Sequence, residues 1–379
     1  MSIVKILSSL KITLGCLILL FILTFWGTID QVQNGLYHAQ ERFFHSFYFL
    51  VFGFLPFPGA QLVLWILFVN LVCAAFGRFE YQFSKLGIFI LHIGVILWCV
   101  SAFVTLHGVE ESHLTLREKE GANVSQSYRD WELSIWREEP GRRIVTAYDA
   151  KPFKGGQVLD FSEFGFDVLV KTYYPNAEAY AGPPSGPPEV FNPSGIQALE
   201  PLTSSLEPEK NVPGGIFVLK QESSGAIPPL LLYGAENNDA VIPVGKEVYH
   251  FRLRHKKYPL PLGVRLIDFV KEDHPNTEIA RSYKSKVELR SEGGLSRGVE
   301  ISMNQPLRYK NFTFYQASYA VDARGREIST FAVVKNSGRW LPYLAGLVTF
   351  AGLVTHFVMM AFQRGVPGKI LGKNYSDIR

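Results

Sequence analysis

LGIFILHIGVILWCVSAFVTL, residues 86 to 106, decides the architecture of this chain. The segment has 21 residues and no formal charge, and about 20 apolar residues are enough for a helix to cross a bilayer. We therefore predict a membrane-spanning helix from Leu86 to Leu106. His92 lies in its first third, and an ionisable ring inside a span indicates a functional site, because burying it in lipid is unfavourable.

Three other apolar segments meet the same length criterion, at residues 12–29, 59–76 and 341–362. Lys5 and Lys11 precede the first of them, as in a signal peptide. No Ala-x-Ala-like cleavage site follows it, so we predict a retained anchor.

The charged residues divide the chain into regions. Nearly all of them lie between the third and fourth apolar segments, which predicts a membrane region over 1–106, an extracytoplasmic domain over 107–339, and a last span with a cytoplasmic tail over 340–379. In the short loops, Lys and Arg gather before the first span, between the second and third, and after the fourth. This bias places both termini in the cytoplasm.

Charge and cysteine content exclude several functions. The formal net charge is only +4 and no basic run with interleaved aromatics occurs, so nucleic acid is not a predicted partner. The three cysteines, Cys16, Cys73 and Cys99, all lie in predicted spans. The extracytoplasmic domain therefore has neither a disulfide nor a thiol chemistry of its own.

The extracytoplasmic domain has the alternating pattern of β-strands. Eight segments show it, at residues 131–136, 143–148, 166–175, 216–220, 249–270, 282–291, 312–321 and 328–335. The predicted fold class is an α-helical membrane bundle of four transmembrane helices plus a large antiparallel β-rich domain. Residues 176–213 are rich in Pro, Gly and Ser, which predicts a long surface loop or a partly disordered insertion.

A Phe-rich run at residues 43–57 follows the first span and contains seven phenylalanines. It is predicted either as an amphipathic element at the membrane surface, in contact with lipid, or as a kinked extension of the second span.

Two histidines fall at the same count along antiparallel spans. His92 is the seventh residue from the inner end of the third span, and His356 is the seventh from the inner end of the fourth. Both then lie about 10 Å inside the boundary. Two such imidazoles could ligate one haem iron, as in b-type haem bundles. Alternatively, each could hydrogen-bond a neighbouring helix, and Asn70 of the second span is predicted at the same depth.

The remaining histidines and motifs give weaker signals. His107 and His113 are predicted as solvated residues near the outer surface, and His250, His255 and His274 as structural or solvated residues. The sequence has no Cys-x-x-Cys, His-Glu-x-x-His, phosphate loop or Gly-x-Ser-x-Gly, so no catalytic constellation is predicted.

Three stretches resemble one protein family. They are the third span with LTLREKEG after it, the segment ISMNQPLRYKNFTFYQASY at residues 301–319, and the final strand and span. The second contains Asn304-Gln305-Pro306-Leu307 and Tyr315-Gln316. Together they are similar to the ResB family, also called CcsB, of the second cytochrome c maturation system (system II).

The resemblance implies a subunit of a haem-delivery complex in the bacterial inner (plasma) membrane. Its partners would be a CcsA- or ResC-type membrane protein, which carries a Trp-rich haem-handling segment, and apocytochrome c with its Cys-x-x-Cys-His motif. The six Trp residues here are scattered, so this chain would be one half of a cytochrome c synthase and not the whole enzyme. His92 matches the family's haem-contacting histidine, with haem b bound transiently.

Two other functions are compatible with the residues. One is a b-type haem electron carrier with His92 and His356 as permanent ligands; the other is a non-haem membrane scaffold or chaperone whose histidines only join helices.

Overall fold

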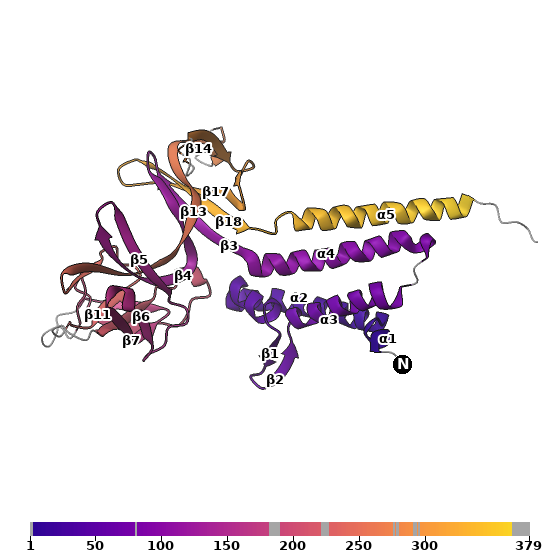
Figure 1. The fold of residues 1–379 in the computed structure, drawn as a ribbon, viewed down its shortest axis with the longest axis horizontal. Coiled ribbons are helices and arrows are strands. Elements are labelled where there is room, and N and C mark those ends of the chain that lie inside the picture. The colour runs from indigo at the N-terminus through magenta and orange to yellow at the C-terminus, as the bar shows by residue number, and fades with distance from the viewer. Residues whose placement is uncertain are drawn as a thin grey trace, which may run out of the picture. The chain divides into compact units, whose positions relative to one another are not determined.

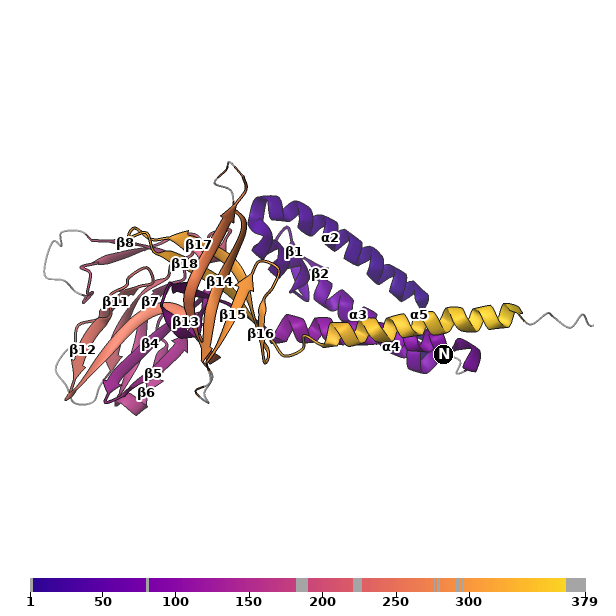
Figure 2. The same cartoon turned by 90° about the horizontal axis from the view of Figure 1, so that it is seen from above.

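The computed structural model describes residues 3–79, 82–181, 190–220, 227–275, 277, 280–290, 294 and 296–365. The chain divides into two compact units. A membrane unit combines Met1–Val109 with Asn336–Arg379, and a β unit consists of Glu110–Lys335. Helices dominate the first unit and strands the second (Figures 1 and 2).

The membrane unit is built from long apolar helices. Its helices are α1 (Ile3–Leu7), α2 (Leu10–Ala39), α3 (Ala60–Val72), α4 (Leu86–Gly108) and α5 (Leu341–Gly365), with π-helical turns at Gln40–Phe44 and Cys73–Arg78 and a 3-10 turn at Phe83–Lys85. Within the described residues, four helical stretches are long and apolar enough to cross a membrane: Leu10–Phe44, Ala60–Gly77, Phe83–Gly108 and Leu341–Phe362.

Helix α2 continues well beyond Ile29, the predicted end of the first span. The helix is therefore longer than the predicted span, because a backbone N–H finds its carbonyl four residues back whatever the side chain. Asp30 accepts a hydrogen bond from Asn34 at 3.1 Å and pairs with Arg42 at 3.3 Å, which holds this polar end together. Gly35 bends the helix at φ 77°, a conformation that glycine adopts readily.

Strands β1 (Tyr48–Val51) and β2 (Leu55–Pro58) form an antiparallel hairpin between α2 and α3. The Phe-rich run is therefore not a kinked extension of the second span, which was one of its two predicted forms. Aromatic residues favour strands, and Pro56 and Pro58 are excluded from a helix interior because they lack the N–H donor.

The β unit is formed by antiparallel strands. Their bounds are β3 (Val109–Arg117), β4 (Gly121–Glu139), β5 (Arg142–Asp149), β6 (Val158–Phe161), β7 (Phe166–Tyr174), β8 (Ala177–Tyr180), β9 (Ala198–Pro201), β10 (Gly214–Lys220), β11 (Leu230–Tyr233), β12 (Ala240–Val244), β13 (Glu247–Asp273), β14 (Ala280–Arg290), β15 (Ser296–Ser302), β16 (Leu307–Tyr309), β17 (Phe312–Val321) and β18 (Glu327–Asn336). Each of the eight predicted strand segments overlaps a strand, and with the four candidate spans this confirms the predicted fold class.

Ten strands of the described residues form the largest sheet. Its order is β15-β14-β13-β4-β3-β18-β17-β16, with β12 paired to β13 and β5 paired to β4. A second sheet has the order β11-β10-β7-β6, and β8 pairs with β9 alone.

Two hydrophobic cores lie along the long strands β4 and β13. Leu133 and Phe251 belong to the first core, while Val264 and Leu266, further along β13, belong to the second. The register between β4 and β13 shifts between His255 and Lys257 and again between Pro259 and Val264. Such bulges bend a strand, and here they let one strand pair serve both cores.

The Pro-rich interval at 176–213 is more ordered than predicted in its described part. It contains the hairpin β8–β9 and a 3-10 turn at Pro208–Lys210. The Asn176 side chain donates to the Thr203 carbonyl at 2.8 Å and accepts from the Val212 N–H at 3.1 Å. Side-chain to backbone bonds thus supply order that hydrophobic periodicity does not signal. The prediction of a disordered insertion also covers residues 182–189, which lie outside the described residues.

Candidate functional site in the membrane unit

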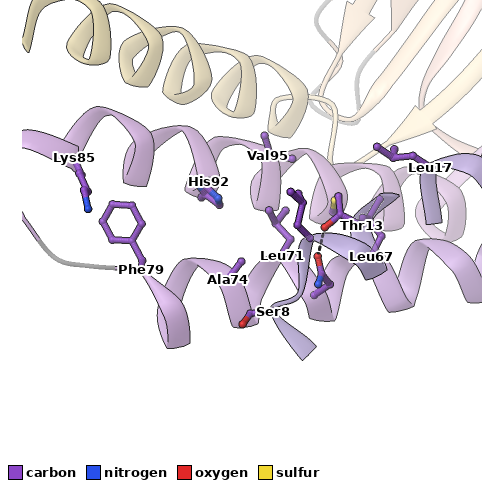
Figure 3. Close-up of a pocket in the computed structure, with 13 residues that line it drawn as sticks. Ser8, Thr13, Leu17, Leu67, Leu71, Ala74, Phe79, Lys85, His92 and Val95 are labelled. Carbon is purple, nitrogen blue, oxygen red and sulfur yellow. Dashed lines mark hydrogen bonds between the residues drawn. The ribbon is translucent and has the colours of Figure 1, made fainter. Parts of the chain in front are cut away.

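A pocket with a volume of about 660 Å³ lies among α2, α3 and α4 (Figure 3). Its walls are mainly apolar, and it is lined by Ser8, Leu10, Thr13, Leu17, Leu67, Asn70, Leu71, Ala74, Phe79, Lys85, His92, Val95 and Cys99. This size is typical of small-molecule sites, which combine apolar walls with a few polar groups. Two of the three predicted site residues, His92 and Asn70, line it together.

Helix α4 presents two different faces. Gly87, Gly94 and Ser101 are buried and repeat every seven residues, so they lie on one face. His92 is displaced from Gly87 by five residues and from Gly94 by two, which rotates it by about 140° and 160° around the helix. His92 therefore lies on the opposite face, with the other pocket residues (Figure 3).

The His92 ring is held in one tautomer. Its Nδ1 lies 2.8 Å from the backbone carbonyl of Ile88, one turn earlier. A carbonyl oxygen only accepts hydrogen bonds, so Nδ1 carries the proton and donates it. In the neutral imidazole, Nε2 then keeps its lone pair, which is the state that ligates a metal ion.

The Asn70 side chain forms hydrogen bonds with residues near the N-terminus and not with His92. Its side-chain oxygen accepts from the Thr13 hydroxyl at 2.7 Å, and its amide donates to the carbonyls of Leu7 and Ser9. The alternative in which Asn70 bonds a membrane histidine is therefore not what the structure shows. Asn70 instead fixes the N-terminus of α2 against α3, which forms one wall of the pocket.

His356 lies apart from the pocket because it belongs to the interface between α4 and α5. A Cβ atom added at Gly87 would lie 2.5 Å from the His356 Cα, one at Gly94 would lie 2.8 Å from the Thr349 Cα, and one at Gly352 would lie 2.6 Å from the Leu91 nitrogen. These three pairs share one antiparallel register, so His356 is level with Gly87.

The prediction that His92 and His356 share one depth is thus wrong by five residues, or about 7.5 Å along the helix. The two histidines also belong to different sides of α4. Counting residues from the predicted ends of the spans could not reveal either difference, because it assumes that both helices begin at the same boundary.

Several lining residues were not predicted. Thr13 stood in an apolar span without an assigned role, and Lys85 was used only for topology. Lys85, His92, Val95 and Cys99 follow one another at seven, three and four residues, which places them on one helical face. This spacing was readable in the sequence, whereas the opposing wall required the fold.

A family model for the ResB-like family matches residues 77–326, which is more than half of the chain. The chain belongs to the ResB-like family. Membership suggests a role in cytochrome c biogenesis. The match includes His92 and most of the β unit, whereas Asn70 and His356 lie outside it. A search of the curated proteins finds no match to the chain.

The ResB motif residue Gln316 has a structural position. Its side-chain oxygen accepts from the Ser285 hydroxyl at 2.7 Å, and its amide donates to the Ser329 hydroxyl at 2.9 Å. All three residues are buried and belong to β14, β17 and β18. A buried network with satisfied partners specifies one packing arrangement, and this one joins β14 to the pair β17–β18, which are not its neighbours in the sheet order. This part of the motif therefore maintains the fold of the β unit.

His113 and His255 are both half-buried. The prediction that His113 is a solvated residue is therefore wrong. Their ring centroids are 6.5 Å apart; His113 packs on Tyr128 at 4.7 Å and His255 stacks on Trp131 at 3.9 Å. Burial lowers the pKa of both imidazoles, and the neighbouring His113 lowers that of His255 further. Both Nδ1 atoms are buried and make no hydrogen bond among the described residues.

The other histidines agree with structural or surface roles. His250 stacks on Trp136 with ring centroids 5.3 Å apart, and its Nδ1 lies 3.7 Å from an Asp239 carboxylate oxygen. His107, in the last turn of α4, and His274 are exposed. Within the described residues, no group of three or more His, Cys, Asp or Glu side chains could hold a metal ion.

Proposed function

We propose that this ResB-like protein is a membrane subunit of a cytochrome c synthase complex that receives haem in the pocket beside His92 and passes it on for attachment to apocytochrome c. The observation that carries the proposal is the state of His92: its Nδ1 proton is held by Ile88 at 2.8 Å, while the ring lines a pocket of about 660 Å³. Haem is cargo here and not a resident cofactor.

The lining residues suit a haem in their chemistry. Leucine, valine and phenylalanine side chains match the apolar macrocycle, and the imidazole matches the iron. Lys85 lines the same pocket and offers a cation to a propionate carboxylate. His92 is the one imidazole among the described lining residues, and a single protein imidazole suits a cargo that has to leave again.

The proposed topology follows from the short basic loops. With the N-terminus in the cytoplasm, the pocket lies toward the inner leaflet, because Lys85 precedes α4 and Asn70 is near the end of α3. The β unit is then extracytoplasmic. The basic residues expected to follow the fourth span, from Arg364 onward, have side chains outside the described residues or lie beyond them entirely.

The partners follow from what the chain lacks. Residues 107–339 contain no cysteine, so the thiols that bond to haem come from apocytochrome c, which the β unit would position. A CcsA- or ResC-type membrane protein would supply the Trp-rich haem-handling segment. The alternative of a permanent b-type electron carrier needs His92 and His356 on one haem, and the two backbones are offset by five residues on different sides of α4.

Haem content of the purified protein tests the proposal. The full chain, co-expressed with its CcsA-type partner, should copurify with haem, and His92→Ala should lower the haem-to-protein ratio at least tenfold. His107→Ala is the matched control, because His107 is exposed on the last turn of the same helix. Unchanged haem in His92→Ala with the partner still bound would contradict the proposal.

A further inference from the structure

The hairpin between α2 and α3 is apolar on both faces. Residues 47–58, FYFLVFGFLPFP, contain no charged side chain, and the Tyr48 hydroxyl is their one polar side-chain group. One face is packed: Phe49 contacts Phe43 at a ring-centroid distance of 4.8 Å and Trp26 at 5.8 Å, and Val51 is buried beside them. These contacts hold the hairpin firmly on the bundle.

The other face and the tip are exposed. Tyr48 is 65% exposed, Leu50 47%, Phe52 85%, Phe54 76% and Leu55 50%. An antiparallel hairpin with one packed face and one face in water alternates apolar and polar residues. Here the outward positions are as apolar as the inward ones, so the outer face does not have the composition of a water-facing surface.

The tip holds an aromatic residue in an unfavourable backbone conformation. Phe52 has φ +55°, and Gly53 follows with φ +80°. Gly, Asn and Asp adopt a positive φ most easily, and a bulky residue there is a genuine outlier. The presence of Phe at this position indicates that its ring is what the tip requires.

The backbone of β2 is adapted to an environment with little water. Pro56 and Pro58 remove two of the four N–H donors that this strand would otherwise present. An unpaired donor in lipid is strongly unfavourable, and the hydrocarbon core admits only helices and closed barrels. A two-stranded hairpin is therefore suited to the headgroup region, where water still reaches the outer edges.

The position of the hairpin favours lipid as the contacting partner. It projects from the end of α2 and the start of α3, across the direction of the helices (Figure 1). If these helices span the bilayer, the hairpin lies along the membrane surface. Helix α2 also has an exposed apolar stripe that runs toward the hairpin, formed by Phe21, Phe25, Ile29, Val32 and Leu36.

We propose that residues 47–58 form a lipid anchor, whose aromatic tip and outer face lie at the boundary between headgroups and acyl chains. Phe52 and Phe54 enter this boundary, while Phe49 and Val51 fix the hairpin to the bundle. A protein interface carries a polar rim around its apolar centre, and residues 47–58 have none. Aromatic residues are instead enriched where a membrane protein meets the bilayer surface.

Photocrosslinking of the full chain in lipid nanodiscs tests this anchor. Benzoylphenylalanine replaces Phe52 or Phe54, and the nanodiscs contain phosphatidylcholine and phosphatidylglycerol. After irradiation, mass spectrometry should find lipid adducts on the hairpin peptide at least fivefold more often than with benzoylphenylalanine at Tyr180. Tyr180 is the control because it is a 40% exposed aromatic residue on strand β8 of the β unit.

A second variant separates anchoring from folding. Phe52→Asn suits the positive φ, so the thermal unfolding midpoint in detergent should not fall. The lipid adduct of benzoylphenylalanine at position 54 should decrease in this variant. Lipid adducts no more frequent than at Tyr180, or crosslinks in native membranes to a protein in place of lipid, would overturn the proposal.

Discussion

The two faces of α4 show how one helix can both hold a bundle together and leave room for a ligand. On the face toward α5, the small residues Gly87, Gly94 and Ser101 repeat every seven residues, and at the two glycines the backbone of α5 approaches closely enough to exclude a Cβ atom. On the opposite face, Lys85, His92, Val95 and Cys99 border a pocket of about 660 Å³. Close packing on one side fixes the helix, and this permits a cavity on the other.

The largest effect is expected when two glycines of α5, Gly352 and Gly346, are each replaced by alanine. Gly352→Ala places a Cβ 2.6 Å from the Leu91 nitrogen, which is backbone and cannot move aside easily. We expect a loss of about 1–3 kcal/mol in the free energy of unfolding. The measurement is thermal or denaturant unfolding of the purified chain in detergent.

Gly346→Ala is the matched control for this prediction. The nearest atom to its new Cβ is Trp98 Cζ2 at 3.8 Å, an ordinary van der Waals distance. Stability should stay constant or rise by up to about 1 kcal/mol, because alanine favours helix more than glycine. Equal effects of the two substitutions would show that α4 and α5 do not pack through this register.

The two membrane histidines offer the next test, since they lie on different sides of α4. His92→Ala removes the pocket imidazole, whereas His356→Ala changes a residue whose backbone contacts Gly87. We expect the first to lower copurifying haem at least tenfold, equivalent to about 1.4 kcal/mol of binding free energy, and the second to change it less than twofold. Haem absorption per mole of protein measures both; similar losses would restore the model of a shared haem.

Asn70 and Thr13 test the pocket wall. Asn70→Leu removes a bond to Thr13 and leaves two backbone carbonyls, of Leu7 and Ser9, without that donor. We expect a destabilisation of about 1–2 kcal/mol. Thr13→Val removes only the 2.7 Å bond and should cost about 0.6 kcal/mol, a common value for such bonds in membranes. Unfolding in detergent compares the pair, and a larger effect of Thr13→Val would contradict the assigned roles.

The smallest expected effect is on the pH dependence of stability and concerns His113 and His255. Their Nδ1 atoms make no hydrogen bond among the described residues, whereas Nδ1 of His92 bonds to the Ile88 carbonyl. Burial depresses the pKa of His113 and His255 in the folded β unit, so the unfolded chain binds more protons below about pH 6.5. The stability from these neutral rings is complete above that pH and decreases as the pH falls toward the folded pKa. The thermal unfolding midpoint of the full chain should fall by about 2–4 °C for each kcal/mol lost.

A double variant isolates this contribution. Replacing His113 and His255 together by Phe removes both titrating groups while keeping an aromatic ring against Tyr128 and Trp131. The acid-dependent decrease between pH 7.5 and pH 5.5 should become smaller than in the native chain. An unchanged pH dependence would show that these two rings do not control it.

The fold class was predictable because it depends on composition over long windows. Four apolar stretches and eight alternating segments each sum many residues, so single errors cancel. The sequence did not predict the short strands β6, β8, β9, β11 and β16, because three or four residues do not establish a period. Helix α2 extends beyond the predicted end of the first span, and the Phe-rich run does not take the kinked helical form that was one of its two predictions, since polarity and aromatic content do not report backbone hydrogen bonding.

The sequence alone determined that His92 is an ionisable residue within a span and that the chain has the architecture of the ResB-like family. It also contained the heptad of small residues on α4. Only the tertiary structure decided which histidine reaches the pocket. Helix register depends on how facing side chains fit, and here the absence of Cβ atoms at Gly87, Gly94 and Gly352 sets a register that leaves His92 with Asn70 and moves His356 away.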